Sequence, residues 1–228
     1  MKTRTRLRFV LVSTIFCALG FAAPAAAVYV PITVQNFSFE APPLLDGAYT
    51  MEATAWGTET INCGIWSCGT FNANSAHYST TPSTHGSQIA FSNGGVLSQT
   101  LTTTLTANTT YRLQVDIGDR LDSQFAGYSL QLRATPNADG AGSMLLAEQL
   151  TAVTPNDGWL TATLDYASGS GPLIGQFLQI RMSSNNPILP TQTDFDNVRL
   201  NFVPEPGSLA LIGLGLMGLG ALRRRCTA

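Results

Sequence analysis

Hydrophobic and polar residues alternate with a two-residue period along much of the chain between residues 28 and 203. In residues 110–118 (TYRLQVDIG) the apolar positions are Tyr111, Leu113, Val115 and Ile117. The same pattern recurs in 128–134 (YSLQLRA), 160–166 (LTATLDY) and 177–182 (FLQIRM). Such alternation predicts β-strands with one buried face, and no segment here keeps a helical period for long.

Clusters of turn-forming residues separate these segments. They include PNADGAGS (136–143), TPNDG (154–158), YASGSGP (166–172) and SSNNP (183–187). Many short strands joined by Gly, Asn and Pro turns are typical of antiparallel sandwiches. We therefore expect an all-β fold, an antiparallel β-sandwich of the jelly-roll type, spanning residues 28–203.

The last alternating segment, TDFDNVRLNF (193–202), contains carboxylates among its apolar positions. The parity that holds Val198 also holds Asp194 and Asp196, so at least Asp196 is expected on the inward face, where a charge needs a partner. The segment VQNFSFEAP (34–42) offers Asn36 and Glu40 beside phenylalanines. Calcium takes six to eight oxygen ligands, so Asn36, Glu40 and Asp196 are candidate ligands that would tie the two ends of the domain together. A site in which Asp196 accepts backbone N–H bonds and Glu40 is solvated fits the spacing equally well.

The N-terminus has the layout of a secretory signal peptide over residues 1–27. Basic residues precede an apolar run, and the small residues Ala25, Ala26 and Ala27 follow it. We expect signal peptidase to cut after Ala27. The alternative is a retained membrane anchor, although the apolar run is shorter than the ~20 residues that a span prefers.

The C-terminus combines a proline-flanked acid, an uncharged run and a basic cluster. Pro204, Glu205 and Pro206 precede residues 207–222, and Arg223, Arg224 and Arg225 follow them. The uncharged run would form about 24 Å of helix at 1.5 Å per residue, enough to cross a thin bilayer. The arginines would hold its end on the cytoplasmic side. A core helix is the alternative, but terminal arginines do not suit a core.

Charge is distributed unevenly between these ends and the domain. The whole chain has a formal net charge of −2, yet residues 28–203 hold five arginines, no lysine and thirteen acidic residues. That acidic surface argues against a nucleic-acid partner, because phosphate binding needs a basic patch. An acidic surface of this kind is instead suited to binding divalent cations.

Cys63 and Cys68 are the cysteines that remain once the two ends are removed. In an oxidising compartment they are expected to form a disulfide that closes a small loop. A zinc site is the alternative, but zinc would need two further ligands, and the histidines of the domain, His77 and His85, lie in a Ser/Thr-rich loop. Trp66, between the two cysteines, is the candidate for stacking on a sugar ring, whereas Trp56 and Trp159 are expected to pack.

Catalytic motifs are sparse. No nucleophile-elbow motif accompanies the histidines, so a hydrolytic triad is unsupported. Asp116, Asp119 and Asp122 could supply paired carboxylates for a glycosidase, but they are more simply explained as a strand end and a solvated turn.

The C-terminal pattern closely resembles the PEP-CTERM sorting signal of Gram-negative bacteria. The resemblance implies that an exosortase recognises the tail (204–228), cuts near Pro204–Pro206 and releases the protein to the cell surface or extracellular matrix. Until then the precursor would be held in the inner membrane through the tail. Cys226, Thr227 and Ala228 extend the tail beyond its usual end.

The domain resembles calcium-binding jelly rolls of the galactose-binding-like and carbohydrate-binding-module group through NFSFEAP (36–42) and FDNVRL (195–200). These two motifs, with residues 97–120 and FAGYSLQL (125–132), also look like the Stig cyclases, calcium-dependent enzymes of indole-alkaloid synthesis. The resemblance implies a structural Ca²⁺ held by Glu40 and Asp196, and it matches Asp194 to the acid of the cyclases. The sequence thus predicts an exported, calcium-stabilised module that binds extracellular polysaccharide. The alternatives are a cyclase that uses Asp194 and a structural matrix protein without a small ligand.

Overall fold

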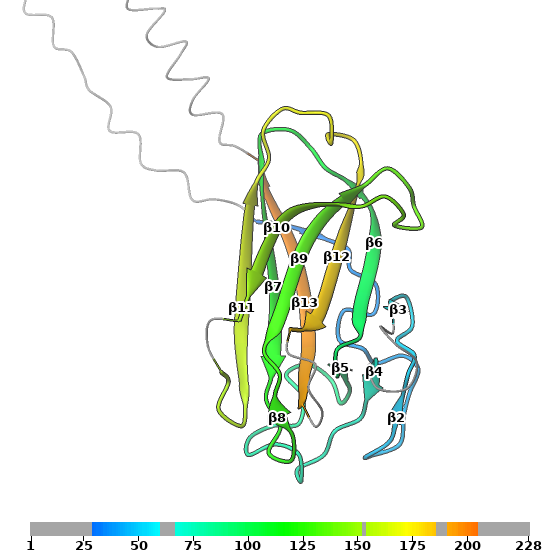
Figure 1. The fold of residues 1–228 in the computed structure, drawn as a ribbon, viewed down its shortest axis with the longest axis vertical. Helices are drawn as coiled ribbons and strands as arrows, with labels where there is room; N and C mark the ends of the chain where they lie inside the picture. The colour runs from blue at the N-terminus through cyan, green and yellow to red at the C-terminus, as the bar shows by residue number, and fades with distance from the viewer. Residues whose placement is uncertain (1–28, 60–66, 152–153, 186–190, 205–228) are drawn as a thin grey trace, which may run out of the picture.

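The computed structural model describes residues 29–59, 67–151, 154–185 and 191–204, which form two packed β-sheets (Figure 1). The all-β prediction is confirmed, and these residues contain no helix. Within them, no helical segment is long and apolar enough to cross a bilayer. The predicted signal peptide (1–27), the helix 207–222 and the residues Glu205, Pro206 and Arg223–Arg225 lie outside the described residues.

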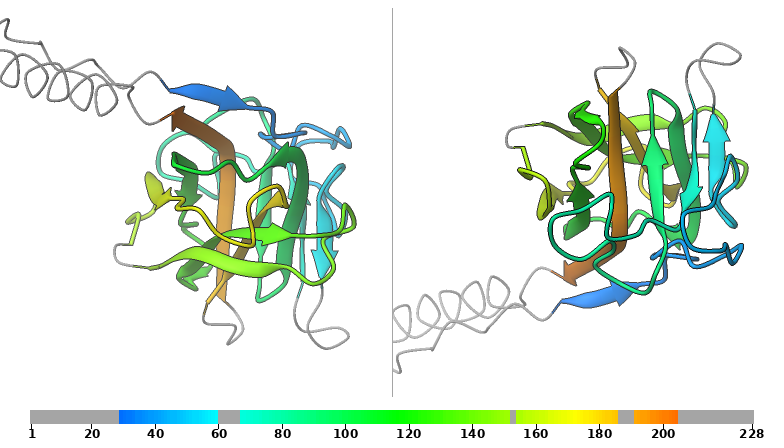
Figure 2. Two further views of the ribbon diagram at one scale, coloured as in Figure 1. Left: turned by 90° about the horizontal axis from the view of Figure 1, so that it is seen from above. Right: turned by 90° about the horizontal axis from the view of Figure 1, so that it is seen from below.

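The larger sheet is built around the last strand. Its order is β11 (Trp159–Ala167), β7 (Thr109–Gly118), β13 (Thr191–Pro204), β5 (Ile89–Ser92), β4 (Cys68–Phe71) and β2 (Tyr49–Thr50). Two short strands also pair with β13, β1 (Val30–Ile32) antiparallel and β8 (Gln124–Phe125) parallel. Figure 2 shows β1 lying alongside the C-terminal end of β13. The chain therefore enters and leaves the sandwich at neighbouring points.

The smaller sheet covers one face of the larger one. Its order is β10 (Met144–Leu150), β9 (Tyr128–Thr135), β12 (Phe177–Ser184), β6 (Val96–Thr104) and β3 (Gly57–Glu59), all antiparallel. Between the sheets lies the main core, which contains the predicted inward residues Tyr111, Leu113, Val115, Ile117, Leu130, Leu132, Leu178, Ile180 and Met182. Each of these is at most 1 % exposed, so the alternation was interpreted correctly on both sheets.

A β-bulge in β13 changes which side of the strand faces this core. Phe195 pairs with Ile117 and Leu200 pairs with Leu113, so both point inward although they are an odd number of residues apart. The register shifts between Asp196 and Arg199, where Asn197 adopts a positive φ of 51°. The bulge inserts one extra residue into β13, which allows Phe195 and Leu200 to face the same side of the sheet.

The prediction that at least Asp196 points into the sandwich is therefore wrong about the face, and Asp194 shares the same side of the strand. Asp194 pairs with Phe91, and Asp196 pairs with Asp116 on the outer face of the larger sheet. Both carboxylates are nevertheless 0 % exposed. The cover is the loop of residues 72–88 between β4 and β5, which packs Tyr78 and Ala73 with Phe71, Ile89 and Phe91 into a second, smaller core.

Of the two cysteines predicted to form a disulfide, only Cys68 lies among the described residues. Cys68 is buried in β4, with its Sγ 3.4 Å from the carbonyl oxygen of Val96. Cys63 lies outside the described residues, so the disulfide stays a prediction.

Candidate active site

Asp194 occupies the centre of the second core. Its Oδ2 accepts a hydrogen bond from the Tyr78 hydroxyl at 2.5 Å, and its Oδ1 accepts one from the Gln192 amide at 2.6 Å. Burial raises the pKa of Asp194 to about 6, although the Tyr78 bond and the charge of Arg120 oppose that rise. The carboxyl can therefore hold a proton at mildly acidic pH, when an exposed aspartate would have lost it.

Tyr78 is held in place by an aromatic stack. Its ring lies 5.0 Å from that of Trp159 with an interplanar angle of 14°, and the indole Nε1 of Trp159 donates to the Thr81 carbonyl at 2.9 Å. A Cβ at Gly118 would collide with both rings, so the glycine in β7 makes room for them. Burial raises the pKa of Tyr78 well above its usual value, which keeps the hydroxyl a donor.

A cavity of about 350 Å³ lies next to this carboxyl. Its lining residues are Gly47, Tyr49, Met51, Ser67, Phe71, His77, Phe91, Asn93, Arg120 and Gln192. Gln192 connects the cavity to Asp194 through its amide, and Phe91 is the strand neighbour of Asp194. The buried acid therefore lies directly behind the cavity wall.

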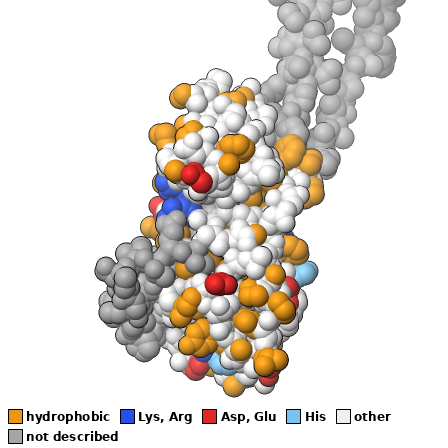
Figure 3. Space-filling view, turned by 90° about the vertical axis from the view of Figure 1, so that its right-hand side faces the viewer, with side chains coloured by type: hydrophobic (Ala, Val, Ile, Leu, Met, Phe, Trp, Pro, Cys, Tyr) orange, Lys and Arg blue, Asp and Glu red, His pale blue; other side chains and the backbone are white. Residues whose placement is uncertain are grey.

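Aromatic and apolar side chains form the outer rim of the cavity. Tyr49 is 65 % exposed, and its ring packs edge-on against Phe91 at 6.2 Å. Met51 is also exposed, and Figure 3, which views the side of the molecule that carries β2 and β3, shows hydrophobic side chains gathered over its lower half. The cavity thus combines an apolar rim with the polar side chains of Ser67, His77, Asn93, Arg120 and Gln192.

The positive charge at the cavity belongs to Arg120. Its guanidinium makes two bonds to Asp122, at 2.8 and 2.6 Å, and lies 4.9 Å from the centre of the Phe71 ring. The pairing lowers the pKa of Asp122. Arg120 thus stays oriented beside the ligand space and favours the ionised form of Asp194 once its proton has left.

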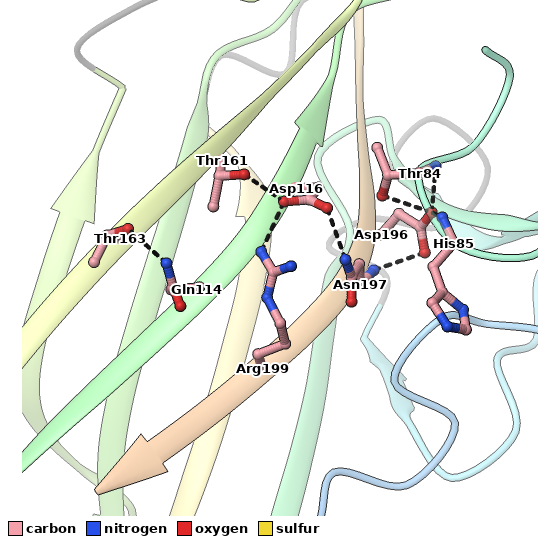
Figure 4. Close-up of polar contacts among 9 residues, drawn as sticks. All are labelled: Thr84, His85, Gln114, Asp116, Thr161, Thr163, Asp196, Asn197 and Arg199. Atoms are coloured by element: carbon pink, nitrogen blue, oxygen red, sulfur yellow. Dashed lines mark hydrogen bonds and ion pairs between the residues drawn. The ribbon is translucent and has the colours of Figure 1, made fainter. Parts of the chain in front are cut away.

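Asp196 is bonded to the far end of the 72–88 loop. Its Oδ2 accepts from the Thr84 N–H (2.8 Å), the Thr84 hydroxyl (3.0 Å) and the His85 N–H (2.7 Å), whereas among the described residues its Oδ1 has one donor, the Asn197 N–H at 2.6 Å (Figure 4). Burial raises the pKa of Asp196 to about 6 against these bonds. The N–H contacts anticipated from the sequence are present.

Glu40 holds the same stretch of loop from the other side. Its Oε1 accepts from the N–H groups of Ser87 and Gln88, both at 2.9 Å, and its Oε2 accepts from the Ser87 hydroxyl at 3.1 Å. Asp196 and Glu40 therefore both bind residues 84–88. Each has one oxygen with several donors and another with a single donor, so each keeps lone pairs that could face a cation.

The comparisons with known proteins identify the family and support the fold. The family model of the HpiC1 cyclase matches residues 30–201, which is the whole described sandwich except its ends. The chain belongs to the HpiC1 cyclase family. The PEP-CTERM protein-sorting motif matches residues 202–225, which confirms that interpretation of the tail and marks an exported, exosortase-processed protein of the Gram-negative cell surface.

Solved cyclase structures share the fold of this HpiC1-family domain. An apo cyclase from Fischerella sp. is 27 % identical, covers 77 % of this chain and 97 % of its own, and has a TM-score of 0.66. The Stig cyclase Fisc from Fischerella sp. TAU, in complex with (3Z)-3-(1-methyl-2-pyrrolidinylidene)-3H-indole, is 29 % identical, covers 78 % and 99 %, and has a TM-score of 0.67. A cyclase from Fischerella sp. TAU in complex with 4-(1H-indol-3-yl)butan-2-one has a TM-score of 0.64 at 29 % identity, covering 78 % and 98 %. No match is found among curated proteins.

The other predicted site residues of the HpiC1-family domain are Asn36 and Trp66. The side-chain amide of Asn36 accepts from the Ala41 N–H (3.1 Å) and donates to the carbonyls of Ala41 and Thr54. It therefore fits a cation site less well than Glu40 and Asp196 do. Trp66 lies outside the described residues, whereas Trp56 is buried.

The remaining carboxylates considered for a glycosidase are engaged in hydrogen bonds with neighbouring strands and loops. Asp116 is bonded to Thr161, Asn197 and Arg199 (Figure 4), and Asp119 accepts from the Asp157 N–H. Within the parts of the chain that the structure describes, no group of three or more His, Cys, Asp and Glu residues is placed to hold a metal ion.

Sequence reasoning missed two members of the site. They are Tyr78 and Gln192, neither of which the sequence pattern assigns as a partner of Asp194. Tyr78 lies in a loop without periodicity, so no local pattern assigns it a partner, and its contact with Asp194 spans 116 residues.

Proposed function

We propose that this domain is an exported cyclase-like enzyme in which Asp194 donates a proton to a flat, apolar substrate bound in the neighbouring cavity. The observation that carries the proposal is the Tyr78–Asp194–Gln192 arrangement behind that cavity. An indole is the substrate class we favour, because related cyclases were solved with indole ligands and the cavity rim is aromatic.

The chemistry follows from the hydrogen bonds of the carboxyl. The Asp194 O–H gives its proton to a substrate double bond, and the resulting cation rearranges or closes a ring. The carboxylate left behind is stabilised by the Tyr78 hydroxyl, the Gln192 amide and the nearby charge of Arg120. When the cation loses a proton back to Asp194, the enzyme is restored and the product is an isomer of the substrate.

Deuterium exchange tests the acid without knowledge of the natural substrate. Incubation with 4-(1H-indol-3-yl)butan-2-one in D₂O should place deuterium on the indole ring faster than buffer does, as followed by NMR. Asp194→Asn should abolish the enhancement, and Tyr78→Phe should reduce it by roughly 10- to 100-fold. Asp165→Asn, an exposed carboxylate on the same sheet, is the matched control. Exchange no faster than buffer, or equal rates in Asp194→Asn, would rule out the acid.

Polysaccharide binding remains the second candidate, and the exposed Tyr49 ring supports it. A half-open cavity with an exposed aromatic rim and the polar residues Asn93, Gln192 and Ser67 can also hold a sugar. In that case oligosaccharides should bind, Tyr49→Ala should weaken binding and Asp194→Asn should leave it unchanged. The opposite pattern supports the enzyme.

We also propose that Ca²⁺ binds where Glu40 and Asp196 meet residues 84–88. Both carboxylates retain an oxygen with a single donor, and backbone carbonyls of the loop could complete an oxygen shell. The ion would stabilise the loop that covers Asp194 and neutralise two acidic groups. It has no part in the proton transfer described above.

Thermal unfolding with calcium and with EGTA tests this site. At a hundredfold excess over its dissociation constant, calcium should add about 2.7 kcal/mol to the free energy of unfolding. Asp196→Ala and Glu40→Gln should remove that gain, whereas Glu52→Gln, an exposed residue of the same type as Glu40, should keep it. A calcium effect that survives both substitutions would place the ion elsewhere.

For the tail, we propose that residues 207–222 hold the precursor in the inner membrane until exosortase cuts. Signal peptidase would act first, at the N-terminal segment. The sixteen uncharged residues and the three arginines behind them support a short, temporary span.

A further inference from the structure

The C-terminal end of β13 fixes how far the domain can lie from a membrane that holds its tail. Pro204 pairs with Thr109, so the last strand stays in the sheet up to that residue. The uncharged run begins at Gly207, and only Glu205 and Pro206 lie between. An extended chain spans at most about 3.6 Å per residue, so this end of the sandwich must lie within roughly 10 Å of the start of the run.

Two uncharged loops surround this exit point. Residues 105–108 and 168–176 join strands at the end of the sandwich where β13 finishes (Figure 1, top). Ser168 donates its N–H to the carbonyl of Thr109, the strand partner of Pro204, at 2.9 Å. Neither loop contains Asp, Glu, Lys or Arg.

An apolar groove of about 510 Å³ opens at the same end. Its lining residues are Leu105, Met144, Tyr166, Leu173, Ile174, Gln176 and residues 169–172, none of which is charged. Met144 and the adjacent Leu145 are 55 % and 47 % exposed, and Ile174 is 36 % exposed. Such exposed apolar side chains suggest a contact surface.

Charge favours this end over other faces of the domain. With five arginines against thirteen acidic residues, the domain as a whole is repelled by an anionic lipid surface. Near this end, Arg112 and Asp165 form an ion pair at 2.7 Å, so their charges largely offset each other. The remaining charged residues here are Asp139, in the loop that precedes Met144, and Glu205, directly after Pro204. This end therefore carries few net charges, and it can approach a zwitterionic bilayer at a small electrostatic cost.

We propose that this end, with Met144, Leu145, Leu173 and Ile174, is a membrane-contact surface that rests on the headgroup and acyl boundary while the tail is inserted. The inference rests on the proposed insertion of residues 207–222. Apolar side chains and the tyrosine Tyr166 suit that boundary, where rings and short apolar groups partition well. Contact there would hold the Pro204–Pro206 segment at the membrane surface until it is cut.

Photocrosslinking of the full-length precursor in phosphatidylcholine vesicles with a diazirine lipid tests the surface. Mass spectrometry should find lipid on residues 207–222 and also on 144–145 and 166–176. The double substitution Met144→Asp with Ile174→Asp should lower domain labelling at least fivefold. The matched control, Leu45→Asp with Leu121→Asp, changes exposed leucines outside this surface and should leave labelling as it is.

The outcomes separate the two proposals. Lipid on the tail but not on 144–145 or 166–176 overturns the contact surface and leaves tail insertion intact. No lipid on the tail overturns insertion and the surface with it. Equal labelling at residues 45–51 means general adsorption and also overturns the proposal.

Discussion

At the scale of single residues, the pKa of Asp194 links chemistry to stability. The folded carboxyl has a pKa of about 6, compared with about 3.9 for an unfolded aspartate. Between these values the folded state keeps a proton that the unfolded state has lost. The free energy of unfolding should therefore fall as pH rises from 4 to 6, by up to about 3 kcal/mol for this group.

Asp194→Asn should remove this contribution, which urea unfolding at pH 4, 5, 6 and 7 can measure. Asp165→Asn is the control, because Arg112 lowers the pKa of Asp165 and moves its contribution below this window. Parallel pH profiles for Asp194→Asn and the wild-type protein would show that Asp194 ionises normally and would also weaken the acid proposal.

At the scale of elements, the 72–88 loop depends on a glycine. Gly86 has a φ of +75°, and an added Cβ would collide with the Glu40 carboxylate. Gly86→Ala should cost about 1–2 kcal/mol for the left-handed backbone and displace Glu40 as well. Gly142→Ala is the matched control, because Gly142 has a φ of +73° but no atom within 3.6 Å of a new Cβ. Equal destabilisation in thermal melts would mean that Glu40 does not hold the loop.

The predicted disulfide between Cys63 and Cys68 can be tested by a substitution that leaves the core intact. Cys68 is fully buried, so replacing it would disturb packing whether or not it is oxidised. Cys63→Ser is the better change. We expect it to release one reactive thiol on denaturation, relative to the secreted wild-type protein, without lowering the melting temperature by more than a few degrees. Two free thiols in the denatured wild-type mature protein, with residues 1–27 and the tail removed, would contradict the disulfide.

How far the sequence predicts the structure depends on the element. Alternation identified β7, β9, β11 and β12 because each keeps one register against its neighbour along most of its length. It failed in β13, where the bulge at Asn197 reverses the parity. The carboxylates were correctly expected to be buried, but their cover is a loop far away in sequence, whose contacts no local pattern encodes.

At the scale of the whole molecule, the tail should act independently of the fold. Replacing Arg223, Arg224 and Arg225 with alanine removes the cytoplasmic charge that fixes the tail and leaves the described sandwich unchanged. We expect the precursor to be mis-sorted, with at least a several-fold loss of surface protein in fractionation and immunoblotting. Unchanged surface delivery would show that the arginines are dispensable for sorting.

The position of β13 also has a consequence for the order of folding. The last strand to be made is the central strand of the larger sheet, with β7 on one side and β5 on the other. Before β13 is in place, the edges of β7 and β5 that face it are unpaired, and the second core lacks Asp194. The sandwich therefore cannot close before residues 191–204 have been delivered, and the sorting motif begins at residue 202. The first residues of the sorting motif are thus part of the strand that completes the larger sheet, and the rest of the motif follows directly after that strand.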